Sequence, residues 1–139
     1  NIHSNDATHA NIMKSKEFGV NLCAADQNVA SSISGGNTGK KVDKIKVLQE
    51  LGIEFYKAKR IKAPMIKGAA MTAECKLIKA IELGDHTMFV GEVVEASASG
   101  KRPLAYYDGK YWNIGERVQK PPQEVLDKIS RLAEKYRKK

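Results

Sequence analysis

The stretch HTMFVGEVV at residues 86–94, directly after the turn Gly84-Asp85, is the strongest indication of architecture in this chain. A glycine–aspartate pair favours a tight turn, and the β-branched and aromatic residues after it favour a strand. Two long strands, Met71–Glu82 and His86–Ala98, are therefore predicted on either side of the turn. Lysines and glutamates interrupt their apolar positions, which is typical of a sheet with one buried face and one face that reaches a ligand or partner.

His86 occupies the first position of the second long strand. A side chain at that position lies at the rim of a sheet, where it can reach a bound ligand. The alternative is that His86 is only a polar residue at a strand start, and spacing alone favours this simpler interpretation. The rest of the sequence has to decide between the two.

Helices and short strands surround the two long strands. Apolar spacing and capping residues predict three short helices before them, and Pro121-Pro122 precedes a fourth with an apolar docking face at Val125, Ile129, Leu132 and Tyr136. Between these lie an alternating strand, an extended basic segment and a hairpin with an Asp-Gly turn. The predicted helices are Ala7–Ser15 (capped by Ser4 or Asp6), Asp26–Gly36 and Asp43–Leu51, and the other predicted elements are Phe18–Leu22, Phe55–Met65 and Tyr106–Trp112.

Length and composition predict a single domain over residues 1–139, since 42% of the residues are hydrophobic. Antiparallel strands with helices at the side predict an α+β fold, a small β-barrel. No apolar run approaches the roughly 20 residues of a membrane span, and no basic-then-apolar leader is present. Cys23 and Cys75 lack CxxC spacing, as expected of buried cytosolic thiols. A cytoplasmic protein without membrane association is predicted.

The formal net charge of +8 is unevenly distributed. Basic residues concentrate between Lys40 and Lys67 and in the tail Lys135–Lys139. Such a balance favours anionic partners, either nucleic acid or a phosphate-bearing small molecule. The aromatic residues between Tyr106 and Trp112 fall outside both basic blocks, whereas nucleic-acid surfaces interleave stacking residues with cations. This distribution argues against nucleic acid.

Two segments could hold a phosphate. The glycine-rich loop SGGNTGKK at residues 34–41 offers backbone N–H groups and two lysines, Lys40 and Lys41. A helix stop followed by a solvated connection explains the same loop. Thr8 opens a helix N-terminus, where free N–H groups favour an anion, although capping alone also accounts for it. The three histidines are too scattered for us to predict a metal site.

Five segments together resemble the flavin reductase-like, FMN-binding split-barrel proteins, in the branch of the flavoredoxins and archaeal flavoproteins. The first segment, ATHANI at residues 7–12 continued by SKEFGVNL at 15–22, is similar to the family's TH-x-x-I-x-x-S-x-E-F-x-V-N pattern. The similar segments that follow, in the same order, lie within residues 34–44, 74–75, 84–93 and 107–115. The resemblance covers almost the whole chain as far as Gly115.

The resemblance implies an antiparallel, Greek-key-like split β-barrel with peripheral helices, working as a homodimer with FMN at the subunit interface. It also implies roles for individual residues. The segment around Thr8 would hold the FMN phosphate, with Ser4 and Asn5 at the same end. His86, in the family's Gly-Asp-His motif, would position the nicotinamide of NAD(P)H near the flavin. The flavin carries the redox chemistry, and the protein supplies placement.

The sequence departs from the family pattern in two places. Asp6 stands where many members carry an arginine, so phosphate binding would depend on neutral donors, the helix N-terminus, and Lys40 or Lys41. The family pattern also begins before Asn1, with N-terminal strands that contact the flavin ring and are missing from this sequence. A chain without them would expose sheet edges.

The sequence as a whole therefore predicts an FMN-binding oxidoreductase. It would pass electrons from NAD(P)H through FMN to free flavin, ferric iron or a partner protein. One alternative is a flavin-binding electron carrier with no NAD(P)H turnover of its own. The other is a basic barrel that binds RNA or DNA.

Overall fold

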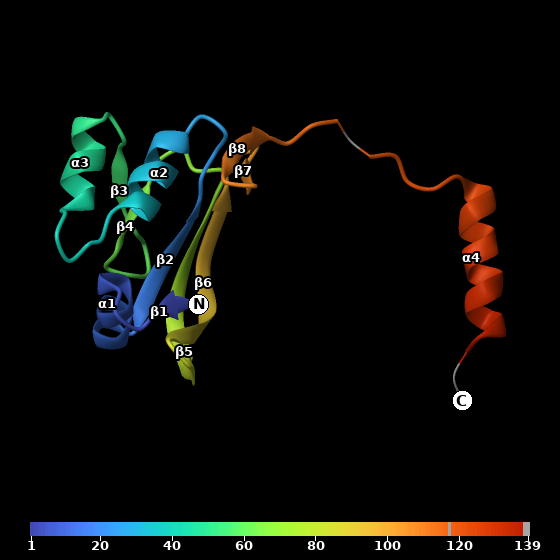
Figure 1. The fold of residues 1–139 in the computed structure, drawn as a ribbon, viewed down its shortest axis with the longest axis horizontal. Helices are drawn as coiled ribbons and strands as arrows, with labels where there is room; N and C mark the ends of the chain where they lie inside the picture. The colour runs from blue at the N-terminus through green and yellow to red at the C-terminus, as the bar shows by residue number, and fades with distance from the viewer. Residues whose placement is uncertain (117, 138–139) are drawn as a thin grey trace.

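A four-stranded antiparallel sheet forms the centre of the molecule in the computed structural model, which describes residues 1–116 and 118–137 (Figure 1). Lys138 and Lys139 of the basic tail lie outside the described residues. The strand order is β1-β6-β5-β2. The strands are β1 (Ile2–His3), β2 (Glu17–Leu22), β5 (Met71–Leu83) and β6 (His86–Ala98).

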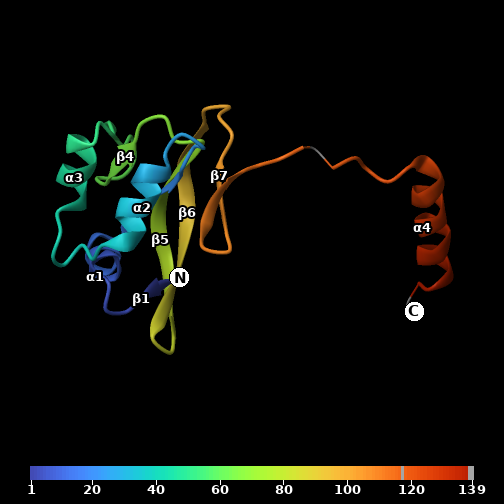
Figure 2. The same ribbon diagram turned by 45° about the horizontal axis from the view of Figure 1, so that its top comes forward.

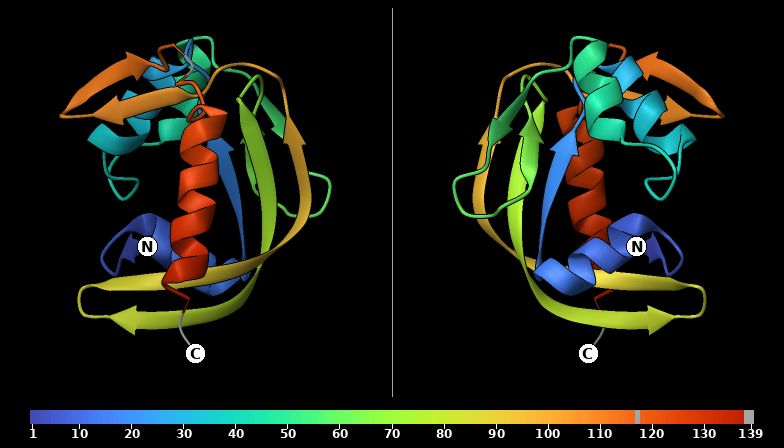
Figure 3. Two further views of the ribbon diagram at one scale, coloured as in Figure 1. Left: turned by 90° about the vertical axis from the view of Figure 1, so that its right-hand side faces the viewer. Right: turned by 90° about the vertical axis from the view of Figure 1, so that its left-hand side faces the viewer.

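The long hairpin β5–β6 confirms the two strands predicted around the Gly84-Asp85 turn. Leu83 pairs with His86 across this turn, and Gly84 has a positive φ of 64°. The register of the hairpin shifts between Glu74 and Cys75 and again between Leu77 and Lys79. Such irregularities bend strands and increase their twist, and both strands curve strongly in Figure 3.

Three helices and a small second sheet lie on one side of the central sheet (Figures 1 and 2). They bury two apolar clusters, one around Ala30, Leu48 and Ile66 and the other around Ile61 and Met65. These elements are α1 (Ala7–Ser15), α2 (Asn28–Gly36), α3 (Lys44–Glu50), β3 (Phe55–Lys57) and β4 (Pro64–Ile66).

Gly91, on β6 within the stretch 86–94, leaves room for a side chain from strand β2. A Cβ atom built on Gly91 would lie 2.6 Å from Cζ of Phe18 and 3.0 Å from Cβ of Cys75. Phe18 is on β2 and Cys75 on β5, so the absent side chain leaves room for the Phe18 ring against the hairpin.

Two of the predicted elements differ in the structure. The segment Phe55–Met65 is not one extended run, because residues 58–63 form a loop between the antiparallel strands β3 and β4. The second helix begins at Asn28 with Gln27 as its N-cap, not at Asp26. Asp26 instead accepts a hydrogen bond from the Lys101 ammonium at 2.7 Å.

The C-terminal part consists of the hairpin β7 (Leu104–Tyr107) and β8 (Lys110–Asn113) and the helix α4 (Gln123–Lys135). The predicted Asp-Gly turn is confirmed, since Asp108 and Gly109 both have positive φ values. Helix α4 lies apart from the sheet (Figure 1). The apolar face predicted for docking stays exposed, with Ile129 53% and Leu132 44% accessible. Among the described residues, no helix is long and apolar enough to cross a membrane.

Candidate functional site

A cavity of about 490 Å³ lies beside the first turns of α1. Its lining brings together Thr8 and two lysines far along the sequence, Lys40 and Lys41. The cavity is lined by Ala7, Thr8, Asn11, Gly39, Lys40, Lys41, Val42, Asp43, Lys44 and Ile45. The structure thus brings three of the predicted phosphate ligands into one place.

The loop at residues 38–42 closes on itself by hydrogen bonds and approaches α1 closely at Gly39. The backbone N–H groups of Lys41 and Val42 both donate to the Thr38 carbonyl, at 3.1 Å each. A Cβ atom on Gly39 would lie 3.3 Å from Cβ of Ala7, so only a residue without a side chain fits this close approach comfortably. The tight loop therefore places its two lysines beside the start of the helix.

Lys44 has a different role from Lys40 and Lys41. Its ammonium donates to the carbonyls of Ser34 and Asn37, at 2.8 and 3.0 Å, and so satisfies free carbonyl groups near the end of α2. Lys44 thereby fastens the loop to α2.

The N-terminus of α1 favours an anion. Asp6 is its N-cap but makes no side-chain cap hydrogen bond, and the first turn contains no acidic residue. The first N–H groups of a helix lack intrahelical partners, and the helix dipole adds partial positive charge. Together with the Thr8 hydroxyl and the two lysine ammonium groups, this is a donor set suited to a phosphate.

Ser4 and Asn5, which were predicted at the phosphate end, do not line this cavity. They lie in the turn between β1 and α1. The Ser4 backbone N–H donates to the Asp85 carbonyl at 2.9 Å, and the Asn5 N–H donates to Nδ1 of His3 at 3.1 Å. Both residues are therefore closer to the Gly84-Asp85 turn and His86.

His86 forms a polar cluster with two residues at the end of the long hairpin. Its Nδ1 is 2.7 Å from Oδ1 of Asp85, and Nε2 of His3 is 3.8 Å from the other Asp85 oxygen. The rings of His3 and His86 meet edge to face at 5.1 Å. The hydrogen bond from His86 lowers the pKa of the Asp85 carboxyl, so this group stays ionised.

Sequence reasoning missed that His3 and His9 also belong to this corner. β1 pairs with the start of β6, which places His3 opposite His86. Nε2 of His9 is 2.9 Å from the hydroxyl of Thr87, and its ring is 5.3 Å from that of Phe89. No group of three His, Cys, Asp or Glu residues able to hold a metal occurs in residues 1–116 and 118–137.

The phosphate cavity and the His86 cluster flank one short turn. Thr8 is five positions after His3 in the sequence, so their Cα atoms are at most about 18 Å apart.

A second cavity, of about 580 Å³, lies beside the last turn of α1. It shares Asn11 with the first cavity, and its far wall is the loop before β4. The lining residues are Asn11, Lys14, Ser15, Glu17, Lys62, Ala63 and Pro64.

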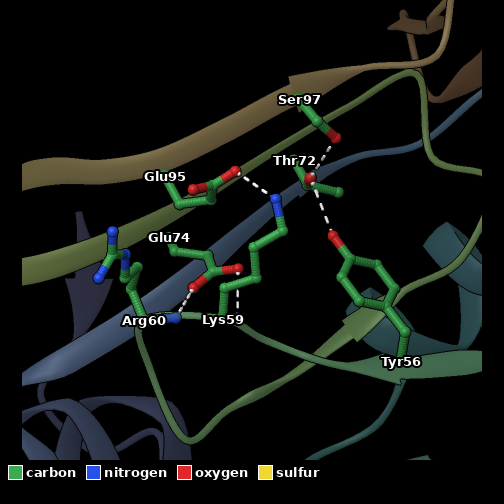
Figure 4. Close-up of polar contacts among 7 residues, drawn as sticks. All are labelled: Tyr56, Lys59, Arg60, Thr72, Glu74, Glu95 and Ser97. Carbon is green, nitrogen blue, oxygen red and sulfur yellow. Dashed lines mark hydrogen bonds and ion pairs between the residues drawn. The ribbon is translucent and has the colours of Figure 1, made fainter.

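Two buried carboxylates hold the loop 58–63 on the sheet. Glu74, only 3% exposed, accepts from the backbone N–H groups of Lys59 and Arg60 at 3.0 and 2.6 Å (Figure 4). Glu17, 8% exposed, accepts from the Lys62 backbone N–H at 2.6 Å and from the Lys76 ammonium at 2.5 Å. The hydrogen bond from Lys76, then that from Lys62, lowers the pKa of Glu17.

Side-chain contacts from the start of this loop and from β3 extend this attachment. The Lys59 ammonium donates to Glu95 on β6 at 2.7 Å, and the Tyr56 hydroxyl is 3.1 Å from that of Thr72 (Figure 4). The loop is thus fixed to both strands of the long hairpin.

A family model and curated relatives of similar sequence agree in the kind of protein that this chain resembles. The family model described as "Flavin reductase like domain" matches residues 1–115. The chain is 30% identical over 105 residues to the reductase component of a 4-nitrophenol 4-monooxygenase/4-nitrocatechol 2-monooxygenase from Rhodococcus opacus, covering 75% of this chain and 51% of that relative. It is 27% identical over 93 residues to FMN reductase (NADH) RutF from Ancylobacter novellus, covering 66% and 48%. The chain spans about half the length of these curated relatives.

The structure is similar to that of an FMN-binding protein from Thermus thermophilus with bound 1-cyclohex-2-enone. The TM-score is 0.74 and the sequence identity 26%, and the match covers 86% of this chain and 70% of the other. This likeness confirms the predicted fold class, an α+β split barrel of the flavin reductase type.

Proposed function

Because the chain belongs to the family of flavin reductase-like domains, we propose that it binds FMN and passes electrons from NAD(P)H through FMN to an acceptor. The observation that supports this most is the cavity in which Thr8, Lys40 and Lys41 meet the N-terminus of α1. The two lysines match the negative charge of a phosphate monoester, and the hydroxyl and helix N–H groups supply directed hydrogen bonds.

The residues present fit FMN even though Asp6 replaces a cation of the family pattern. Thr8, Lys40 and Lys41 would hold the phosphate. Ser4 and Asn5, in the turn beside Asp85, would contact the cofactor outside the phosphate cavity. Each of these ligands is a proposal that mutagenesis can test separately.

His86 would position the nicotinamide. Asp85 occupies Nδ1 of the ring, and Nε2, which has no hydrogen-bond partner among the residues that the structure describes, would hydrogen-bond a substrate. When bound, FMN supplies the redox chemistry, because it accepts a hydride and hands on electrons. The protein's own contribution is to hold the nicotinamide in line with the flavin, where a short and oriented approach accelerates the transfer.

We propose the electron acceptor by analogy with the relatives. The Rhodococcus opacus relative is the reductase component of a monooxygenase. We therefore propose free flavin or a partner oxygenase as acceptor, with ferric iron as a further candidate. We also propose that the protein is a homodimer that completes the flavin site at its interface.

Anaerobic mixing of the FMN-loaded protein with NADH and with NADPH tests this function. If the protein is a flavin reductase, we expect NADH or NADPH to reduce the bound FMN within seconds, faster than it reduces free FMN. The visible flavin absorbance should disappear at the same rate. If the protein is only an electron carrier, it would bind FMN, but NADH and NADPH would reduce the bound FMN no faster than free FMN. A protein that stays colourless after incubation with FMN would contradict both.

A further inference from the structure

The polar cluster at the Gly84-Asp85 turn places one carboxylate between two imidazole rings. Oδ1 of Asp85 is 2.7 Å from Nδ1 of His86, and Oδ2 is 3.8 Å from Nε2 of His3. The two oxygens of Asp85 therefore face different rings. The hydrogen bond from His86 lowers the pKa of the Asp85 carboxyl, so the carboxylate is ionised at neutral pH.

This carboxylate determines where neutral His86 carries its proton. A neutral imidazole has one N–H group and one nitrogen with a free electron pair. An ionised carboxylate only accepts hydrogen bonds, so Nδ1, the nitrogen beside Asp85, must carry the proton. Nε2 of neutral His86 is therefore a hydrogen-bond acceptor and not a donor.

His3 has the opposite arrangement and packs against His86. The backbone N–H of Asn5 donates to Nδ1 of His3 at 3.1 Å, so on neutral His3 the proton lies on Nε2. The contact of this nitrogen with Asp85 is too long for a hydrogen bond. The main contact is that of the rings, which meet edge to face with 5.1 Å between their centroids and 80° between their planes. Pairing of β1 with β6 sets His3 opposite His86 and so confines the His86 ring.

The protonation of His86 decides which kind of group it can bind. An acceptor at Nε2 requires a donor on the ligand. The carboxamide of a nicotinamide ring offers its N–H groups as donors, whereas its carbonyl oxygen only accepts. An acceptor placed for these N–H groups discriminates against an analogue without them, because the acceptor is then left without a partner.

From these contacts we infer that Asp85 and His3 are positioning residues, which hold His86 with Nε2 as an acceptor for the carboxamide N–H of the nicotinamide. This inference rests on the proposed function, in which His86 positions the nicotinamide. Asp85 acts by fixing the tautomer of His86, and His3 acts by restricting the orientation of its ring.

The ¹⁵N NMR spectrum of the histidine side chains tests the assignment without any turnover. At a pH of about 8.5, above the ordinary histidine pKa of about 6.5, the rings are neutral and their tautomers can be distinguished. We expect the proton on Nδ1 of His86. Asp85→Ala removes the acceptor and should abolish this preference for Nδ1–H, and Asp85→Asn, which can present an amide N–H to Nδ1, should move the proton toward Nε2. If the parent protein carries the proton of His86 on Nε2, the inference is overturned.

A substrate analogue tests the recognition that follows from this tautomer. Reduced acetylpyridine adenine dinucleotide has a methyl ketone in place of the carboxamide, so it keeps the carbonyl and lacks the N–H groups. Stopped-flow reduction of the FMN-loaded protein gives the Kd of each nucleotide from the dependence of the rate on its concentration. We expect the parent to bind NADH about tenfold more tightly than the analogue, which corresponds to one hydrogen bond.

The variants should change this preference in a defined order. Asp85→Ala should bind the two nucleotides about equally while its FMN affinity stays within about twofold of the parent's. His3→Ala should lose about threefold of the preference, and His3→Phe, which keeps a ring against His86, should retain it. Asp127→Asn, a change of an aspartate on α4, is the control and should behave as the parent.

Because both nucleotides are compared on the same variant, a loss of stability alone does not change their ratio. The inference is overturned if the parent shows no preference for NADH, or if Asp85→Ala keeps the parent's preference. A His86→Ala variant with the parent's reduction kinetics would instead contradict the proposed role of His86 itself.

Discussion

Thr8 offers a single hydroxyl whose removal probes the phosphate cavity. Thr8→Ala deletes one hydrogen bond to a charged group and should weaken FMN binding by about 1–2 kcal/mol. Titration of the apo-protein with FMN, followed by flavin fluorescence, measures the change. Thr8→Ser keeps the hydroxyl and should bind FMN nearly as the parent does. Equal affinities of the alanine variant and the parent would remove Thr8 from the site.

His86 should affect hydride transfer and not FMN binding. In His86→Ala, we expect flavin reduction by NAD(P)H to slow at least about tenfold, equivalent to about 1.4 kcal/mol of barrier, with FMN affinity retained. Stopped-flow absorbance normalised to bound FMN is the measurement. If the variant loses stability and FMN together, while its rate per bound flavin survives, His86 is only a structural residue at the strand start.

The surroundings of His86 show which residues of a site can be identified from a single sequence and which cannot. The sequence identifies His86, Thr8, Lys40 and Lys41 as candidate site residues, because each lies in a segment with a local signature. His3 carries no such signature, since it reaches His86 only through the pairing of β1 with β6. Ser4 and Asn5 were assigned with Thr8 because they are adjacent in sequence, yet the turn directs them to Asp85 and His3.

At the scale of structural elements, the attachment of the loop 58–63 to the sheet depends on ionised carboxylates. Burial raises the pKa of Glu74, but the backbone N–H groups of Lys59, Arg60 and Ile61 lower it more, so it lies below the ordinary 4.5. A carboxyl group with a lower pKa in the folded state stabilises that state above its unfolded pKa. This stabilisation is lost as the pH falls through the folded pKa.

We therefore expect the thermal unfolding midpoint to fall as the pH decreases below 4.5. Glu74→Gln cannot accept both backbone N–H groups as the carboxylate does, so it should unfold at a lower temperature at neutral pH and show a weaker acid dependence. Circular dichroism melts over a pH series measure both effects. The control is Glu54→Gln, whose exposed pair with Lys67 should contribute little. A Glu74→Gln variant that melts like the parent at every pH would refute this role.

Elements with strong local patterns were predictable, and those set by distant contacts were not. The hairpin β5–β6 and the turn Asp108-Gly109 follow from residue type. The break between β3 and β4 does not, because Glu17 and Glu74, which hold the loop, come from other strands. The apolar stripe of α4 predicts a docking face, but the helix lies apart from the sheet and the stripe stays exposed.

For the molecule as a whole, the exposed apolar side chains on the sheet favour association with a second copy. Val20, Ile78 and Val93 are 41%, 66% and 58% exposed. We expect a homodimer with about twice the chain mass of 15.3 kDa in light scattering. FMN should be bound at one molecule per chain. A monomer that still binds FMN tightly would contradict the proposed interface site.

The order of strands and helices and the order of the five segments were sufficient for the fold class, since both indicate an antiparallel α+β barrel. The cavity beside α1 was not predictable, because it depends on how the loop 38–42 folds back onto the helix. That the whole of residues 1–139 behaves as one domain stays a prediction, as the family match ends at residue 115.

The most direct test of the phosphate cavity compares FMN with riboflavin, which has the same ring system but no phosphate. We expect the full chain to bind FMN at least about tenfold more tightly than riboflavin, with inorganic phosphate competing for FMN. Equal affinities for the two flavins, or no binding of FMN, would contradict the assignment of Thr8, Lys40 and Lys41 to a phosphate.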